Sequence, residues 1–227
     1  MICSTRDAAF WAAGEAVLDS REFHAALTVT PDAFGLAAMF YVSGESRRSP
    51  VQQAIARSLQ KLGVATCLVE LLAPEEAEEA GQRADVSLLA RRAHAALDIL
   101  ASRCDTRRLP LAVLATDGSV PAAIAVAECR AGQIDALVAC CGRPDLAPVD
   151  LRSIRVPTLL IVPSKDRCLV EHNEHVFERL NCPSQLAVIV GASRTFSEPG
   201  TLVACDYVVQ QWCERHLRSA ASRPFAR

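Results

Sequence analysis

The chain has no excess of charge of either sign, and this excludes one class of partner. Its 227 residues include 24 lysine and arginine residues and 26 aspartate and glutamate residues, for a formal net charge of -2 and a pI near 6.2. A protein that holds a nucleic-acid backbone needs a basic surface, because the phosphates are attracted by positive potential. We therefore expect no nucleic-acid partner.

Targeting and membrane-spanning signals are also missing from the sequence. The first 18 residues contain no basic segment followed by a continuous apolar core. No later stretch reaches the roughly 18 apolar residues that a helix needs to cross a bilayer. These absences predict a cytoplasmic protein with no membrane partner.

The ten cysteines form no C-x-x-C pair, the spacing that is typical of zinc ligands. Many lie in apolar segments, as do Cys67, Cys129, Cys205 and Cys213. We therefore expect most of them to be buried, reduced thiols, and we expect no metal or other cofactor. Cys140 and Cys141 are adjacent at the end of an apolar run, which leaves a redox or nucleophilic role open for this pair.

Apolar runs typical of strands alternate with amphipathic segments typical of helices, without internal repeats or low complexity. A content of 51% hydrophobic residues supports one domain over residues 1–227. The expected strands are a hairpin within residues 17–30 and the runs 36–42, 64–71, 111–115, 134–140, 157–162 and 186–190. Such alternation predicts an α/β fold, a mostly parallel sheet with helices on both faces and an antiparallel N-terminal hairpin.

The expected helices have recognisable ends. Ser49 and Pro50 cap and begin one helix that Gly63 ends, and Asp85 caps a second that buries one apolar side. The other helices run from the turn after the 111–115 strand to about residue 130, over about 171–180 and over about 201–217. Two sets of surface residues are expected: an acidic run at 74–79 as a solvated loop or short helix, and a solvated face with Arg91, His94 and Asp98. The last helix places Val203, Tyr207, Val208, Gln211 and Trp212 along one side.

The segment LAVLATDGSVPAA, residues 111–123, predicts a buried strand that turns sharply into a helix. Asp117 stands at the apex, and the small residues Ala115 and Ser119 lie two places before and after it. This spacing fits the G-x-S-x-G nucleophile elbow, in which bulky neighbours would block the turn.

Four further segments accompany the elbow in chain order: FYVSGESRRSP (40–50), CGRPDL (141–146), LLIVPSKD (159–166) and VGASRTFSEPG (190–200). Together the five segments resemble the small dienelactone-hydrolase-like branch of the α/β-hydrolase fold, over most of the chain. The resemblance implies that Asp117 stands at the nucleophile position, Asp166 at the acid position and Arg194 at the histidine position of a catalytic triad. It also implies oxyanion-hole positions at Val42 and Gly118.

Three of these positions depart from the family pattern, and the triad is interpreted as degenerate. An aspartate at residue 117 either keeps the strained turn without chemistry or is a nucleophile that forms an ester at an alkyl carbon. Arg194 cannot act as a general base, because a guanidinium has a pKa above about 12. Tyr41-Val42 replaces the family's His-Gly, so a branched side chain stands where a substrate oxygen would approach, and Glu45 adds negative charge nearby.

Other histidines offer little replacement for the missing base. His172 and His175 are the nearest candidates by sequence, whereas His24, His94 and His216 fall on elements away from the expected site. The substitutions at Asp117 and Arg194 are chemically compatible with each other, since one guanidinium binds two carboxylates. We therefore hypothesise a structural Asp117-Arg194-Asp166 cluster with buried carboxylates, in which Arg194 lies within about 4 Å of each.

The sequence favours a non-catalytic hydrolase-fold protein that binds a small-molecule ligand or a partner. The alternative is a hydrolase of a small ester, a lactone or an alkyl halide, with Asp117, Cys140 or Cys141 as the nucleophile. Redox sensing by the two adjacent cysteines is a third hypothesis.

Overall fold

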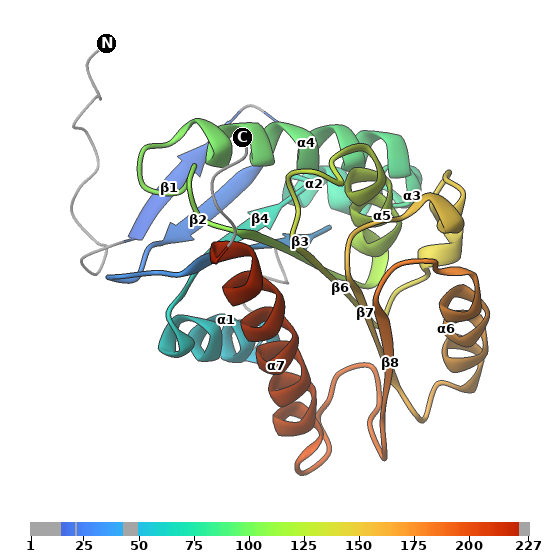
Figure 1. The fold of residues 1–227 in the computed structure, drawn as a ribbon. Helices are drawn as coiled ribbons and strands as arrows, with labels where there is room; N and C mark the ends of the chain where they lie inside the picture. The colour runs from blue at the N-terminus through green and yellow to red at the C-terminus, as the bar shows by residue number, and fades with distance from the viewer. Residues whose placement is uncertain (1–14, 21, 43–49, 223–227) are drawn as a thin grey trace.

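The computed structural model of the chain describes residues 15–20, 22–42 and 50–222, and it contains one eight-stranded sheet (Figure 1). The strand order is β1-β2-β4-β3-β5-β6-β7-β8. The strands are β1 (Glu15–Asp19), β2 (His24–Thr28), β3 (Gly35–Tyr41), β4 (Val64–Glu70), β5 (Leu111–Thr116), β6 (Ala136–Cys140), β7 (Thr158–Pro163) and β8 (Ser184–Ile189).

The pairing confirms the predicted fold class. β1 and β2 form an antiparallel hairpin, and β2 pairs antiparallel with β4. All remaining neighbours, from β4 through β3 to β8, are parallel. Parallel strands need crossover connections, which is why a helix or a long loop separates them in the chain.

Helices cover both faces of the sheet, as Figure 1 shows. They are α1 (Pro50–Leu62), α2 (Pro74–Glu78), α3 (Ala80–Ala84), α4 (Val86–Ser102), α5 (Val120–Cys129), α6 (Arg167–Arg179) and α7 (Thr201–Ala221). Alternate residues of β3 enter two apolar clusters, one with α4 and α5 and the other with α1 and α7. The strand is therefore buried on both faces, and its sequence is continuously apolar rather than alternating.

Several local predictions are confirmed at the helix ends. Gly63 follows α1 with a φ of 89°, a left-handed conformation that favours glycine at the end of a helix. The Asp85 side chain accepts a hydrogen bond of 2.9 Å from the Leu88 N–H at the start of α4. Ser49, the expected cap of α1, lies outside the described residues.

Two surface predictions hold in part, and one helix boundary is corrected. The acidic run forms the short helix α2, one of its two expected forms, but its Glu76 is only partly exposed, because it binds Arg92 through two hydrogen bonds of 2.6 and 2.7 Å. Arg91 and Asp98 are exposed as expected, whereas His94 is half-buried, and the Arg130 Nε at the end of α5 donates to its Nδ1 at 2.7 Å. Helix α6 begins at Arg167 rather than near residue 171, since Asp166 provides an N-cap that was not anticipated.

Across the described ranges, no helix is long and apolar enough to cross a membrane.

Candidate functional site

The predicted elbow lies at the carboxyl end of β5. The chain leaves β5 through a single 3-10 turn, Asp117–Ser119, and enters α5 directly. Asp117 has a φ of 47°, a strained conformation that aspartate tolerates better than most residues. Ser119 is buried, and its Oγ accepts a hydrogen bond of 3.0 Å from the Thr116 N–H. Ser119 therefore stabilises the turn, a role beyond the small size that the sequence pattern required.

Gly142 supports the elbow from the bend just after the adjacent strand, β6. A Cβ at this position would lie 2.3 Å from the Val120 Cγ2 and 2.7 Å from the Asp117 carbonyl oxygen. Real Cβ atoms do not approach other atoms so closely, so a side chain at residue 142 would push the elbow out of place. Sequence reasoning missed this role, although a glycine directly after a buried strand is a signal of close backbone approach.

Asp166 is positioned by the helix that follows it. Its Oδ1 accepts a hydrogen bond of 3.0 Å from the Leu169 N–H and so caps α6. Its other oxygen, Oδ2, accepts a hydrogen bond of 2.7 Å from the Arg194 Nε. The acid position of the family is therefore occupied by a carboxylate whose two oxygens both have partners.

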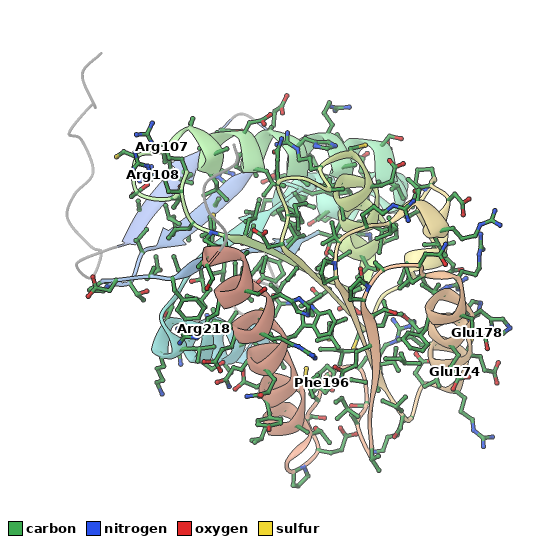
Figure 2. All side chains as sticks on the ribbon, viewed as in Figure 1. Arg107, Arg108, Glu174, Glu178, Phe196 and Arg218 are labelled. Carbon is green, nitrogen blue, oxygen red and sulfur yellow. The ribbon has the colours of Figure 1, made fainter. Side chains whose placement is uncertain are left out.

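The loop that carries residue 194 is firmly held. The Lys165 ammonium lies 2.6 Å from a Glu198 carboxylate oxygen, and the Ser193 N–H donates to the same carboxylate at 3.0 Å. Phe196 is only 5% exposed, and it anchors the loop with a φ of 48°. Figure 2 places Phe196 beside α7. These contacts fix the position of the loop that carries Arg194. Glu198 is the first residue of the E-P-G pattern, and its contacts with Lys165 and Ser193 were not anticipated from the sequence.

The structure brings the three triad positions together. The Arg194 Nε lies 2.7 Å from the Asp166 Oδ2, and the Arg194 Nη1 lies 3.8 Å from the Asp117 Oδ1. Both separations are inside the limit of about 4 Å that the cluster hypothesis requires. The expected burial is wrong, however, because the side chains of Arg194 and Asp117 are 52% and 59% exposed. The cluster lies at the surface because the carboxyl edge of a parallel sheet opens to solvent.

The electrostatics favour the charged forms of Asp166 and Arg194 and act in opposite directions on Asp117. The hydrogen bond from Arg194 lowers the pKa of the Asp166 carboxyl, and the Leu169 N–H adds to this effect. The surrounding protein displaces water from Asp117 and raises the pKa of its carboxyl, while Arg194 acts in the opposite direction. Its hydrogen bond to Asp166 raises the pKa of Arg194 further. Arg194 therefore cannot accept a proton from a nucleophile or from water.

The two oxyanion-hole positions are adjacent, but a side chain crowds them. The Val42 Cγ2 lies 3.2 Å from the point that a Cβ of Gly118 would occupy. A glycine at position 42 would leave this space open to a substrate oxygen. The valine therefore stands next to the backbone N–H of Gly118 that would stabilise an oxyanion. Glu45, which was expected to add negative charge here, lies outside the described residues.

The other histidines do not assemble a base. The Nδ1 atoms of His172 and His175 lie 2.5 and 2.7 Å from backbone carbonyl oxygens one turn earlier in α6. His94 accepts a hydrogen bond from Arg130, at the end of α5 that is remote from the elbow. The described residues contain no group of three or more histidine, cysteine, aspartate or glutamate side chains that could hold a metal ion.

The adjacent thiols lie beneath the site but are poorly suited to react. The Cys140 and Cys141 Sγ atoms are 3.8 Å apart, and the residues are 7% and 3% exposed. Contact with the Cys141 and Cys205 thiols, together with burial, raises the pKa of Cys140. A buried, protonated thiol is a weak nucleophile, which disfavours a cysteine mechanism. The expectation of burial is wrong for Cys129, which is exposed at the end of α5.

The sharp elbow after β5, the capped acid after β7 and the loop between β8 and α7 define a protein of the α/β-hydrolase fold. The chain belongs to the dienelactone hydrolase family. It is 34% identical to a dienelactone hydrolase from Anabaena variabilis, with a TM-score of 0.83, over 90% of this chain and 97% of that chain. Est1E from Butyrivibrio proteoclasticus shares the fold at 11% identity, with a TM-score of 0.75, over 91% of this chain and all of that chain. No family model matches the sequence.

Two curated proteins of Mycobacterium tuberculosis, from strains H37Rv and CDC 1551, are also similar to this chain. Each is named "Putative phosphoribosyl transferase" and is 37% identical over 193 residues. The match spans 82% of this chain but only 43% of each relative. The chain therefore corresponds to less than half the length of these relatives.

Replacing Arg194 by glutamine is expected to change the free energy of unfolding by less than about 1 kcal/mol, because exposed ion pairs contribute little to stability. Urea denaturation at neutral pH measures this change. Arg215, an exposed arginine on α7, offers a matched Arg215→Gln control. If Arg194→Gln alone lowered the free energy of unfolding by more than about 2 kcal/mol, the cluster would instead be a major contributor to stability.

Proposed function

We propose that this dienelactone-hydrolase-family protein binds a small-molecule ligand or a protein partner at its former catalytic edge without hydrolytic turnover. The observation that carries the proposal is Arg194 at the histidine position, where its Nε donates to Asp166 at 2.7 Å. Hydrolysis needs a group that takes a proton and returns it near neutral pH. A guanidinium held by a carboxylate does neither.

The nucleophile and oxyanion-hole positions also favour a binding site without hydrolysis. Asp117 lacks the hydroxyl or thiol that attacks an ester in this fold, and Val42 crowds Gly118 in the oxyanion hole. At the same time, Glu198 and Lys165 hold the loop of Arg194 in an ordered form. A site that retains a fixed loop but has no general base is suited to binding rather than to catalytic turnover.

We further propose that the binding partner is linked to phosphoribosyl transfer. More than half the length of the curated relatives lies outside the segment that they share with this chain. We place the phosphoribosyl transferase activity, after which those proteins are named, in that remaining part. The hydrolase-fold unit would then act beside a transferase as a binding module.

The preserved elbow favours a second candidate, an aspartate nucleophile at residue 117. Its φ of 47° matches the strained turn of a nucleophile elbow. The carboxylate would displace a halide from an alkyl carbon, form an ester and release the halide ion. Without a base the ester would persist, so this candidate predicts one covalent event per molecule rather than turnover.

An assay with short-chain chromogenic esters tests the proposed function. We expect the wild-type rate to equal the buffer rate, because a missing general base alone costs about a hundredfold or more. The double variant Asp117→Ser, Arg194→His restores two triad members and is the matched positive control. Wild-type activity that disappears in Asp117→Asn would contradict the proposal. Mass spectrometry after incubation with an alkyl halide detects the adduct at Asp117 that the second candidate requires.

A further inference from the structure

The exposed thiols of the chain differ in their neighbours. The structure describes nine of the ten cysteines, all as free thiols. Three of these nine are exposed, namely Cys104, Cys129 and Cys168. The Cys129 thiol donates to a Glu128 carboxylate oxygen at 3.6 Å, and burial together with this carboxylate raises the pKa of Cys129. Cys129 is therefore a poor nucleophile, because the thiolate is the reactive form.

Cys168 contacts a histidine on its own helix. The Cys168 Sγ lies 3.5 Å from the Nδ1 of His172, one turn later in α6. The same Nδ1 lies 2.5 Å from the Cys168 carbonyl oxygen. A carbonyl oxygen only accepts hydrogen bonds, so the Nδ1 carries a proton. His172 therefore presents an N–H donor to the sulfur and does not act as the base that removes the thiol proton.

The other surroundings of Cys104 and Cys168 are closely matched. Each thiol lies near an arginine that is held by both oxygens of an aspartate two residues away. These pairs are Arg103–Asp105 beside Cys104 and Arg143–Asp145 beside Cys168. Cys168 differs by its contact with His172 and by its place in the first turn of α6, where the helix dipole adds positive potential.

We propose that Cys168 is a site of thiol–disulfide exchange with small, soluble disulfides. The Cys168 sulfur attacks one sulfur of the disulfide, a new S–S bond forms as the old one breaks, and the other half leaves as a thiolate. The Cys168 proton passes through solvent to that thiolate, so Cys168 is oxidised and the departing half is reduced. The attacking sulfur carries negative charge, which the Nδ1–H of His172 stabilises. This inference does not depend on the proposed function.

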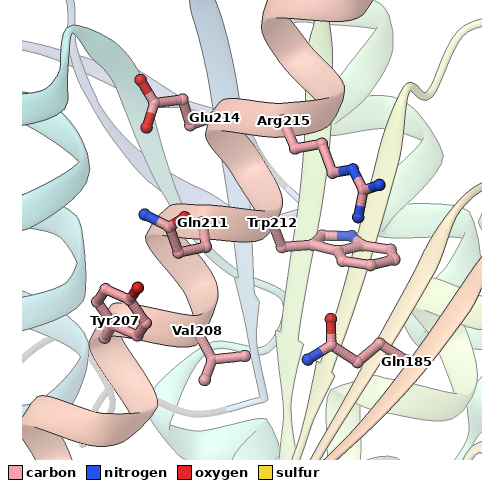
Figure 3. Close-up of a pocket in the computed structure, with 7 residues that line it drawn as sticks. All are labelled: Gln185, Tyr207, Val208, Gln211, Trp212, Glu214 and Arg215. Carbon is pink, nitrogen blue, oxygen red and sulfur yellow. The ribbon is translucent and has the colours of Figure 1, made fainter.

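The groove between β8 and α7 is separate from this site. Its volume is about 500 Å³, and its walls are Gln185, Tyr207, Val208, Gln211, Trp212, Glu214 and Arg215. Figure 3 shows these side chains on α7 and β8, whereas Cys168 and His172 lie on α6. These walls include no cysteine. The groove therefore does not hold the disulfide, and the exposed Cys168 sulfur meets it directly from solution.

Peptide mapping by mass spectrometry tests the proposal. The folded chain is incubated with glutathione disulfide at neutral pH and quenched with acid at intervals, and the mixed disulfide at each cysteine is followed with time. We expect Cys168 to react at least about tenfold faster than Cys104, because one hydrogen bond to a charged group has an effect of this size. Equal rates at Cys168 and Cys104 in the wild-type chain overturn the proposal without any variant.

His172→Leu is expected to slow the reaction of Cys168 about tenfold, toward the rate of Cys104. His175→Leu is the matched control, because the His175 Nδ1 lies 2.7 Å from a backbone carbonyl oxygen of the same helix, that of Glu171. This control should leave the Cys168 rate within about twofold of wild type, and both variants should keep the wild-type circular dichroism spectrum. A Cys168 rate that His172→Leu leaves unchanged also overturns the proposal, because the imidazole would then have no part in the reaction.

Discussion

Gly142→Ala is expected to lower the free energy of unfolding by about 3 kcal/mol, because overpacking at a rigid contact is strongly destabilising. The added Cβ would lie 2.3 Å from the Val120 Cγ2 and 2.7 Å from the Asp117 carbonyl oxygen. One of these contacts is with backbone at the elbow, which cannot rotate away as a flexible side chain can. The Asn173 side chain also donates to the Gly142 carbonyl at 3.1 Å and restricts movement on the other side.

Thermal and urea unfolding measure this effect, and we expect the melting temperature to fall by about 6–12 °C for a chain of this size. Gly132→Ala is the matched control, since a Cβ at that position meets nothing within 4 Å. The control should change stability by less than about 0.5 kcal/mol. Equal stability of the two variants would mean that the elbow and β6 are not in rigid contact.

Arg92→Leu is expected to cost about 2 kcal/mol, because it leaves the partly exposed Glu76 carboxylate and the Leu71 carbonyl without their hydrogen-bond donor. The Arg92 guanidinium donates to both Glu76 carboxylate oxygens, at 2.6 and 2.7 Å, and to the Leu71 carbonyl at 2.8 Å. It is 9% exposed and joins α4 to the segment after β4. Arg91→Leu, at an exposed neighbour on the same helix, is the matched control and should be nearly neutral.

The same ion pair predicts a pH dependence of stability. Hydrogen bonds from Arg92 lower the pKa of Glu76 from 4.5 to about 2. A lowered pKa in the folded state means that the contribution is complete above pH 4.5 and is lost as the pH falls toward 2. The difference in stability between wild type and Arg92→Leu should therefore shrink over this range. A difference that stays constant from pH 5 to pH 2.5 would contradict the assignment.

The fold was largely predictable because its signals are local. The continuous apolar runs of β3 to β7 require burial on both faces, and the caps at Asp85 and Gly63 mark where helices begin and end. The start of α6 was not predictable from apolar spacing. Asp166 has two roles, as helix cap and as partner of Arg194, and the sequence pattern identified only its position in the triad.

The partners of the polar residues were less predictable, because they come from distant parts of the chain. Glu76 and Arg92 are 16 residues apart; Glu76 was expected in a solvated loop or short helix, and nothing in the sequence singled out Arg92. Arg130, just after the end of α5, reaches His94 on α4 across 36 residues. The contacts of Gly142 with Val120 and Asp117 likewise depend on how β6 lies beside β5.

The order of residues was sufficient to define the α/β-hydrolase fold, the family and the identities at the three triad positions, because these depend on local pattern and on side-chain chemistry. The pKa of a guanidinium excludes Arg194 as a base in any surroundings. The exposure of the Asp117-Arg194-Asp166 cluster and the groove beside β8 emerged only in three dimensions. Both depend on which strands and helices lie side by side, since burial is a property of neighbours brought together from distant parts of the chain.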